Sequence, residues 1–160
     1  MLTKLLKQVQ EIGGALIPPP LSEAKTKALK NNAQGYPIPE DYLQWLKIAD
    51  GFYWAGLEFF GSCTHQQDVG CITDLLVQND LYRALSADTK TLIVGKTDDE
   101  NFVYNISKGR YEIRAEFSNE KIKSFSNFEK MMSYLLKEQI ELLQNYVAFN
   151  EEAEELPQDD

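Results

Sequence analysis

The feature that most constrains the fold is the segment DGFYWAGLEFFG, residues 50–61, which places five aromatic side chains in twelve positions. A helical pattern ends where this segment begins, because Asp50-Gly51 is a typical helix stop in which glycine adopts the left-handed conformation. Beyond the stop, Leu57 and Phe59 alternate with other residues, which predicts a short strand whose Leu57 and Phe59 side chains face the core. The chain therefore needs a core that is shared by helices and a sheet.

Periodicity extends this prediction to the whole chain of 160 residues, a length that fits one domain. Apolar spacing and capping residues predict helices over residues 2–12, 23–31, 40–49, 72–85 and 128–149. Alternating or short apolar runs predict strands at 92–94, 102–106 and 111–115, joined by polar turns as an antiparallel meander. We expect a single α+β domain, with a central antiparallel or mixed sheet flanked by helices and a long C-terminal helix.

Most of the excess negative charge lies after about residue 150. The formal net charge is −9, but residues 151–160 hold six acids and no Lys or Arg, which leaves 19 acids against 16 bases in the rest. We therefore expect an α+β domain over residues 1–149 and a flexible acidic tail over 150–160. Such a tail either steers a basic protein partner by long-range attraction or simply aids solubility.

Several classes of function are disfavoured by composition. Phosphate contacts need clusters of Lys and Arg, and none stands out, so we expect no nucleic-acid partner. No stretch approaches the roughly 18 apolar residues that span a bilayer, and the N-terminus lacks the pattern of a signal peptide. The expected location is cytoplasmic, with no membrane partner, and we expect no cofactor.

Three runs resemble the SUKH superfamily, which includes a yeast cell-wall assembly regulator and many bacterial immunity proteins. The first is IPEDYLQWLKIADGF, residues 38–52, followed by LEFFG at 57–61. LIVGKTDDENFVYNISKGRYEI, residues 92–113, is similar to the central hairpin strands of the family, and FSNFEKMMSYLL, residues 125–136, to its closing helix. Details of VGKTDDENFVYN and FEKMM resemble the YrhA-like branch. Residues 62–90 match no pattern of the family.

The resemblance implies an α+β fold and a non-enzymatic protein-binding module, commonly an immunity protein that neutralises a cognate bacterial toxin. It implies no catalytic residues, because the family has none that are established. A regulatory or scaffold subunit of a cytoplasmic complex is an alternative with the same fold, and a small thiol-dependent enzyme is a further one. The gene beside this one would separate immunity from scaffolding, because an immunity protein is encoded next to its toxin.

Cys63, His65 and Cys71 are the only residues whose pattern invites metal or thiol chemistry. A zinc site usually includes a close pair such as Cys-x2-Cys, and Cys-x-His without a second pair is poor spacing for one. Cys63 and His65 lie two apart and share a face on a strand, but the sequence identifies no carboxylate or amide to orient the histidine. We therefore predict no metal site and no catalytic residue, and read both cysteines as free thiols, at least one of them buried.

The candidate contact surface combines aromatic and acidic residues. Tyr53 and Trp54 follow the helix stop, where the chain is expected at the surface, and such aromatic residues often anchor interfaces. The alternative is that both fold back over the core. The turn at 98–101 brings three carboxylates together, either as a contact for a basic partner or as a solvated turn. The predicted partner-binding residues are Tyr53, Trp54, Glu58, Asp98, Asp99 and Glu100.

Overall fold

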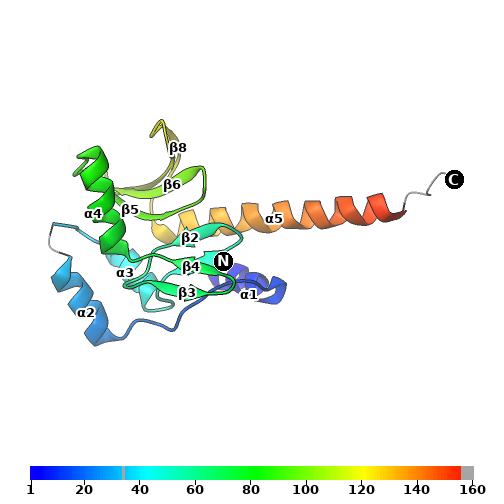
Figure 1. The fold of residues 1–160 in the computed structure, drawn as a ribbon, viewed down its shortest axis with the longest axis horizontal. Helices are drawn as coiled ribbons and strands as arrows, with labels where there is room; N and C mark the ends of the chain where they lie inside the picture. Colours follow the sequence, from blue (N-terminus) through cyan, green and yellow to red (C-terminus); the bar gives the residue numbers. More distant parts are fainter. Residues whose placement is uncertain (34, 156–160) are drawn as a thin grey trace.

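A computed structural model describes residues 1–33 and 35–155 (Figure 1). Within these residues the chain forms five helices and eight strands. In chain order they are α1 (Leu2–Ile12), α2 (Glu23–Asn32), α3 (Glu40–Leu46), β1 (Phe52–Trp54), β2 (Leu57–Phe59), β3 (His65–Gln67), β4 (Gly70–Ile72), α4 (Leu75–Ser86), β5 (Thr91–Lys96), β6 (Glu100–Asn105), β7 (Arg110–Ala115), β8 (Lys121–Phe125) and α5 (Phe128–Glu155).

The strands form one large sheet and one small one. Six strands pair in the order β1-β2-β5-β6-β7-β8, and β3 pairs only with β4. Every pairing is antiparallel. The chain leaves the large sheet after β2, forms the β3–β4 hairpin and α4, and returns as β5. The protein is therefore a single α+β domain with a largely antiparallel sheet and a long C-terminal helix, as the order of helical and alternating patterns predicted.

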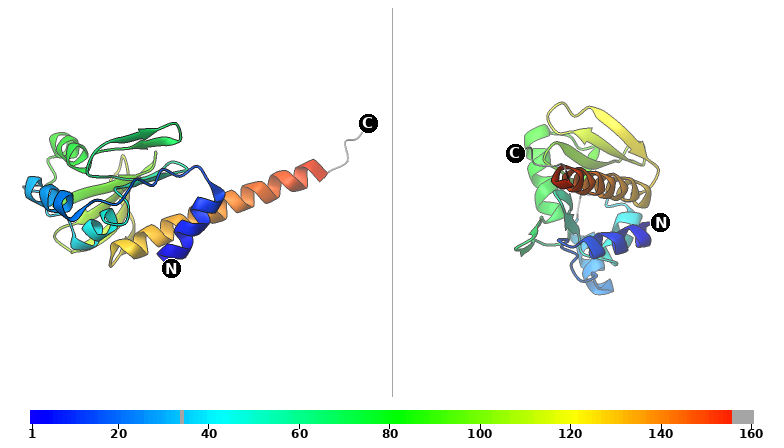
Figure 2. Two further views of the ribbon diagram at one scale, coloured as in Figure 1. Left: turned by 90° about the horizontal axis from the view of Figure 1, so that it is seen from below. Right: turned by 90° about the vertical axis from the view of Figure 1, so that its right-hand side faces the viewer.

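Helices cover both faces of the large sheet. The left view of Figure 2 shows α4 on one side of the sheet and the first half of α5 on the other, with α1 lying across α5. On the α4 side, Asn79 donates to the Ile93 carbonyl oxygen at 2.8 Å and accepts from the Ile93 amide at 2.9 Å. Asn79 is fully buried, so this exchange satisfies both of its polar ends and fixes α4 on β5.

The core is centred on Phe128, the first residue of α5. Its ring lies 5.0 Å from the ring of Tyr42, 6.0 Å from Trp45, 5.1 Å from Phe59 and 5.7 Å from Tyr111, measured between centroids. Edge-to-face contacts of this kind add to the stabilisation that comes from burying apolar area. Thus α3, the sheet and α5 meet at one aromatic cluster.

The IPEDY run has a structural role that its residues explain. The Asp41 carboxylate accepts from the Phe128 amide at 2.8 Å, at the start of α5, and from the Tyr111 hydroxyl at 2.7 Å. Burial raises the pKa of Tyr111, and the hydrogen bond to Asp41 raises it further. The buried Tyr42 hydroxyl donates to backbone carbonyl oxygens on the sheet, including that of Val94 at 3.1 Å. This motif therefore joins α3, β7 and α5.

The predicted helices near the middle of the chain needed correction. Helix α3 ends at Leu46, before the predicted end at residue 49, and Ile48 is exposed. The predicted helix over 72–85 begins at Leu75, because the Asp74 side chain caps it by accepting from two amides of its first turn. The β3–β4 hairpin and strand β8 were not predicted. Phe60, which follows β2, is fully buried.

Helix α5 begins at Phe128, as predicted, but extends further than predicted at its other end. Asn127 caps its start by accepting from the Lys130 amide at 2.9 Å. At its other end the helix continues past Phe149 to Glu155, so residues 150–155 of the expected tail are helical. The remainder of that tail, residues 156–160, lies outside the described residues. A helix of 28 residues is about 42 Å long.

Candidate functional site

Trp54 does not lie on the surface, contrary to the prediction. Only 2% of it is exposed, and its indole Nε1 donates to the Gly13 carbonyl oxygen at 3.1 Å. The residues that follow the helix stop pair at once as β1 with β2, whose register puts Trp54 opposite Leu57. Trp54 therefore fixes the chain after α1 to the core and cannot reach a partner in the folded protein.

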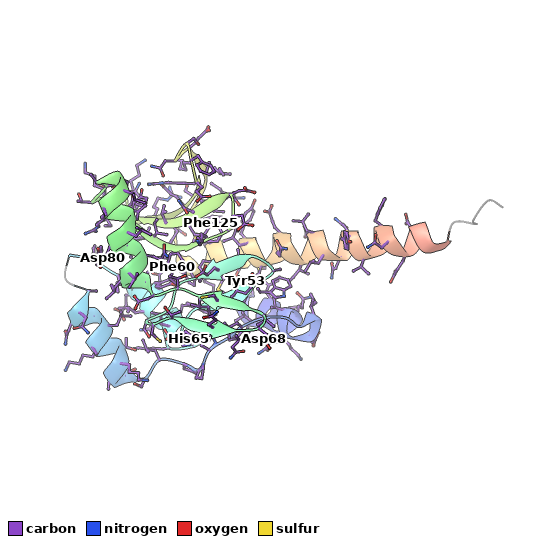
Figure 3. The ribbon with its side chains drawn as sticks, viewed as in Figure 1. Tyr53, Phe60, His65, Asp68, Asp80 and Phe125 are labelled. Carbon is purple, nitrogen blue, oxygen red and sulfur yellow. The ribbon has the colours of Figure 1, made fainter. Side chains whose placement is uncertain are left out.

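Tyr53 is half-buried beneath the β3–β4 hairpin. A Cβ atom at Gly70 of β4 would lie 2.2 Å from the Tyr53 ring, so the ring occupies the space that any larger residue would need. The backbone of Tyr53 exchanges hydrogen bonds with Leu16 at 2.8 and 3.0 Å. Figure 3 shows Tyr53 beside this hairpin, His65 within it and Asp80 apart from both on α4. The alternative weighed for Tyr53 and Trp54, packing over the core, is the one the structure adopts.

Glu58 is also unavailable for a contact. It is 7% exposed, and its carboxylate accepts from the Thr73 amide at 2.7 Å. A buried carboxylate is costly without such a bond, so Glu58 ties the end of β4 to the large sheet. The acidic side chain that alternates with Leu57 and Phe59 therefore serves the fold.

The acidic turn, residues 98–100 between β5 and β6, remains at the surface as predicted. Asp98 and Asp99 are exposed and Glu100 is partly exposed. Partial burial raises the pKa of Glu100, and the charges of Glu138 on α5 and of Asp99 raise it further. The turn is thus crowded with like charges, and it lies beside α5.

Phe117 extends this surface, and no sequence pattern had singled it out. It lies in the β7–β8 turn and is 95% exposed. The adjacent residue, Glu116, donates its amide to the Asp99 carbonyl oxygen at 3.0 Å, which places Phe117 beside the acidic turn. A fully exposed phenylalanine beside carboxylates provides an apolar contact that an isolated acidic turn lacks.

The second half of α5 projects from the body of the molecule (Figures 1 and 2). We call residues 141–155 the α5 arm. Leu142, Tyr146 and Phe149 are 63%, 65% and 70% exposed, and Val147 is also exposed. Together they expose on the order of 400 Å² of apolar surface, a patch size that on a monomer is often functional. The arm thus exposes several large apolar side chains to solvent.

The exposed side chains of the arm continue a face that begins in the core. Phe128, Leu135, Leu142 and Phe149 are spaced by seven residues, and the first two are buried against the sheet. Glu138, beside Glu100, is followed four residues later by Leu142, so the acidic turn adjoins this face. The seven-residue spacing was the sequence signal for this surface, but the sequence alone did not show which of these residues the body of the molecule covers.

The charge of the arm has one sign. No Lys or Arg follows Lys137 in the sequence, whereas Glu141, Glu151 and Glu152 are all within the arm. Apolar side chains on one face and carboxylates around it suit a basic partner that also offers apolar surface. We call the acidic turn, Phe117 and the α5 arm together the turn–arm surface.

A separate cluster forms at Asp50, which the sequence assigned only to the helix stop. Its buried carboxylate accepts from the Ser62 amide and the Ser62 hydroxyl, both at 2.7 Å. The same carboxylate lies 2.8 Å from His65 Nε2, and Cys63 Sγ lies 3.6 Å from that nitrogen. Cys71 lies outside the cluster, against the Ile72 carbonyl oxygen. Both cysteines are free and exposed, although at least one was expected to be buried.

The geometry of this cluster does not suit a thiol nucleophile with its base. Asp50 and Cys63 both face Nε2 of His65, whereas a nucleophile–base–carboxylate relay uses the two ring nitrogens separately. When Nε2 carries a proton for the carboxylate, it cannot accept one from the thiol. The three side chains do bring one sulfur, one nitrogen and one oxygen within 4.8 Å of each other, a set that could hold a metal ion.

A buried ion pair on the α4 side of the sheet is structural. Arg114 donates to the Glu112 carboxylate at 2.8 and 3.0 Å and to the Thr91 hydroxyl at 3.0 Å. Burial alone would raise the pKa of Glu112, but the hydrogen bonds and charge of Arg114 outweigh it, so the pKa is lowered. The pair lies within β7, and the bond from Arg114 to Thr91 links β7 to β5 across β6.

Comparison with known proteins adds no relative: no family model matches the chain, and no curated protein matches it. The SUKH resemblance therefore stays a prediction. Among the helices of residues 1–33 and 35–155, none is both long and apolar enough to cross a membrane. The fold and the surface define a single α+β domain that carries a projecting, acidic and amphipathic helix.

Proposed function

We propose that the chain is a non-enzymatic protein-binding module whose contact surface is the turn–arm surface. The observation that carries this proposal is the continuation of the apolar face of α5 beyond the body, where Leu142, Tyr146 and Phe149 are mostly exposed. Such side chains lower the solubility of a monomer and gain about 25 cal/mol for each Å² that a partner removes from water. The arm is thus suited to binding.

The two kinds of residue on this surface have different effects on binding. Tyr146 and Phe149 are large aromatic side chains on a helix, the kind of residue that often contributes 2 kcal/mol or more at an interface. The carboxylates of the acidic turn stay hydrated at its rim, where charge mainly accelerates the encounter with an oppositely charged partner. We therefore expect a basic partner, captured by charge and retained by the arm.

The finer proposal is that the partner is a bacterial toxin domain and the chain an immunity protein. It rests on the SUKH resemblance of residues 38–61, 92–113 and 125–136. Asp41 and Tyr42, two of the residues that carry the resemblance, hold the fold together through their hydrogen bonds. A module without catalytic residues would then act by covering the toxin.

Affinity capture from the native host tests the proposal. The baits are the wild-type chain, an arm variant (Tyr146→Ser with Phe149→Ser) and a control, Leu85→Ser, which changes a residue of α4 that is 80% exposed. A partner retained by wild type and control but lost by the arm variant would support the proposed surface. Rescue by this chain of cells that express the partner would identify it as a toxin.

Binding kinetics with the purified partner then distinguish the contribution of the acidic turn from that of the apolar arm. Neutralising the acidic turn (Asp98→Asn, Asp99→Asn, Glu100→Gln) should slow association, by a factor that shrinks as salt rises. The arm variant should speed dissociation by roughly 30-fold or more, which corresponds to the loss of about 2 kcal/mol. Unchanged kinetics in both variants would contradict the assignment of this surface.

A further inference from the structure

We infer that Asp50, Cys63 and His65 form a zinc site with three protein ligands and an open fourth position. The site is separate from the turn–arm surface, and the inference does not depend on the proposed function. Its donor atoms are Asp50 Oδ2, Cys63 Sγ and His65 Nε2. Thiolate, imidazole and carboxylate are the three side-chain groups that bind zinc in proteins, and a set that includes sulfur favours zinc over magnesium or calcium.

The distances between the donors fit a tetrahedral ion. With bonds of about 2.3 Å to sulfur and about 2.0–2.1 Å to nitrogen and oxygen, tetrahedral angles place the donors roughly 3.3–3.6 Å apart. Here Sγ lies 3.6 Å from Nε2 and 3.8 Å from Oδ2, and Nε2 lies 2.8 Å from Oδ2. A widening of about 0.5 Å between His65 and Asp50 would admit the ion. Small side-chain rotations are sufficient for this change.

Ser62 orients the Asp50 carboxylate for metal binding. The Ser62 amide donates to Oδ1 of Asp50, and its hydroxyl donates to Oδ2, so both oxygens are oriented while Oδ2 keeps a lone pair. Hydrogen bonds of this type to a metal ligand commonly tune affinity. Among the described residues no Lys or Arg pairs with this buried carboxylate, so a bound cation would neutralise it.

The backbone brings the ligands together from segments that are fixed independently. Asp50 precedes Gly51, whose φ of 97° turns the chain sharply after α3. His65 pairs with Ile72 in the β3–β4 hairpin, and the Ile72 side chain is fully buried. Cys63 lies two residues before His65 and is exposed. The site is therefore rigid on the carboxylate side and open to solvent at Cys63, where water would complete the tetrahedron.

Binding of zinc to this site releases a proton. The Cys63 thiol loses its proton to solvent and binds as thiolate, and zinc binding is accordingly weaker at low pH. His65 binds through the lone pair of Nε2, so the neutral ring of the bound state carries its proton on Nδ1. Binding of one ion thus releases one proton from a chain in which His65 is neutral, and no oxidant or reductant takes part.

Titration of the full-length, metal-free chain with Zn²⁺ and with Co²⁺ tests the inference. We expect one ion per chain, and for Co²⁺ the visible spectrum of a tetrahedral site together with a thiolate-to-cobalt charge-transfer band. Cys63→Ser and His65→Gln should each weaken Zn²⁺ binding by roughly 100-fold or more, since even residues that only orient a ligand commonly cost 10–100-fold. Circular dichroism shows whether each variant is folded.

Cys71→Ser is the matched control, because Cys71 is equally a free, exposed cysteine but lies outside the cluster. It should retain the stoichiometry, the affinity and the charge-transfer band. Absence of stoichiometric Zn²⁺ binding by the wild-type chain would overturn the inference. So would binding that Cys63→Ser leaves unchanged, or that Cys71→Ser weakens as much as Cys63→Ser does.

Discussion

Replacement of Trp54 distinguishes a core residue from a contact residue. The indole is almost fully buried, and its Nε1–H bonds to the Gly13 carbonyl oxygen. Trp54→Ala removes the whole ring from a packed site, which typically costs 3–5 kcal/mol. Trp54→Phe keeps most of the apolar volume but loses the hydrogen bond, worth about 1 kcal/mol, and leaves a gap. We expect a total of about 2 kcal/mol for Trp54→Phe.

The assay is urea unfolding followed by far-ultraviolet circular dichroism, because tryptophan fluorescence changes with the substitution itself. Phe117→Ser is the control, since this aromatic residue is 95% exposed and its loss should change the free energy of unfolding by less than about 0.5 kcal/mol. If Trp54→Phe costs no more than Phe117→Ser, Trp54 is not in the core and the packing of β1 described above is wrong.

Three further predictions concern the hairpin and two carboxylates. Gly70→Ala should destabilise the chain by about 1–3 kcal/mol in urea unfolding, because the added Cβ meets the Tyr53 ring at 2.2 Å. Glu112→Gln should cost about 3 kcal/mol near neutral pH. That cost should diminish as acid titrates the wild-type residue through its lowered pKa, below about pH 4, which unfolding at a series of pH values measures. Glu100→Gln should stabilise the chain by about 0.2–0.5 kcal/mol near neutral pH, because ionised Glu100 is repelled by its neighbours. Since the folded pKa of Glu100 is raised, this gain should vanish once acid protonates the wild-type side chain; a loss of stability near neutral pH would contradict the crowding.

The elements with clear periodicity were predictable. The face of α1, the Ser22 cap of α2 and the meander of β5, β6 and β7 follow from spacing and turn residues alone. These patterns are local, so a short window of sequence contains them. The α+β class followed from their order.

The β3–β4 hairpin and the burial of Trp54 were not predictable in this way. Residues 65–67 are His-Gln-Gln, without the alternation that marks a half-buried strand, and the hairpin is fixed by the distant contact between Gly70 and Tyr53. Trp54 follows a helix stop, where a surface loop is the usual expectation. Its burial depends on pairing with β2 and on the Gly13 carbonyl, both of which are tertiary contacts.

The Asp50 cluster also depends on tertiary contacts that the sequence does not reveal. Cys63 and His65 were recognised as a pair from their spacing, but their third partner lies 13 residues before Cys63 and belongs to a helix stop. Only the fold brings the end of α3 beside the β2–β3 connection. The α5 arm, by contrast, has a clear sequence pattern. Apolar residues recur every seven positions in α5, and the last of them lie beyond the part of the helix that the body covers.

Hydrogen–deuterium exchange of the chain, alone and bound to the partner captured from its host, locates the surface that the partner covers. Binding at the turn–arm surface predicts slower exchange in residues 97–101, in the β7–β8 turn and in the α5 arm, with the β3–β4 hairpin unchanged. Protection confined to the hairpin, with the arm exchanging as fast as in the free chain, would contradict binding at the turn–arm surface.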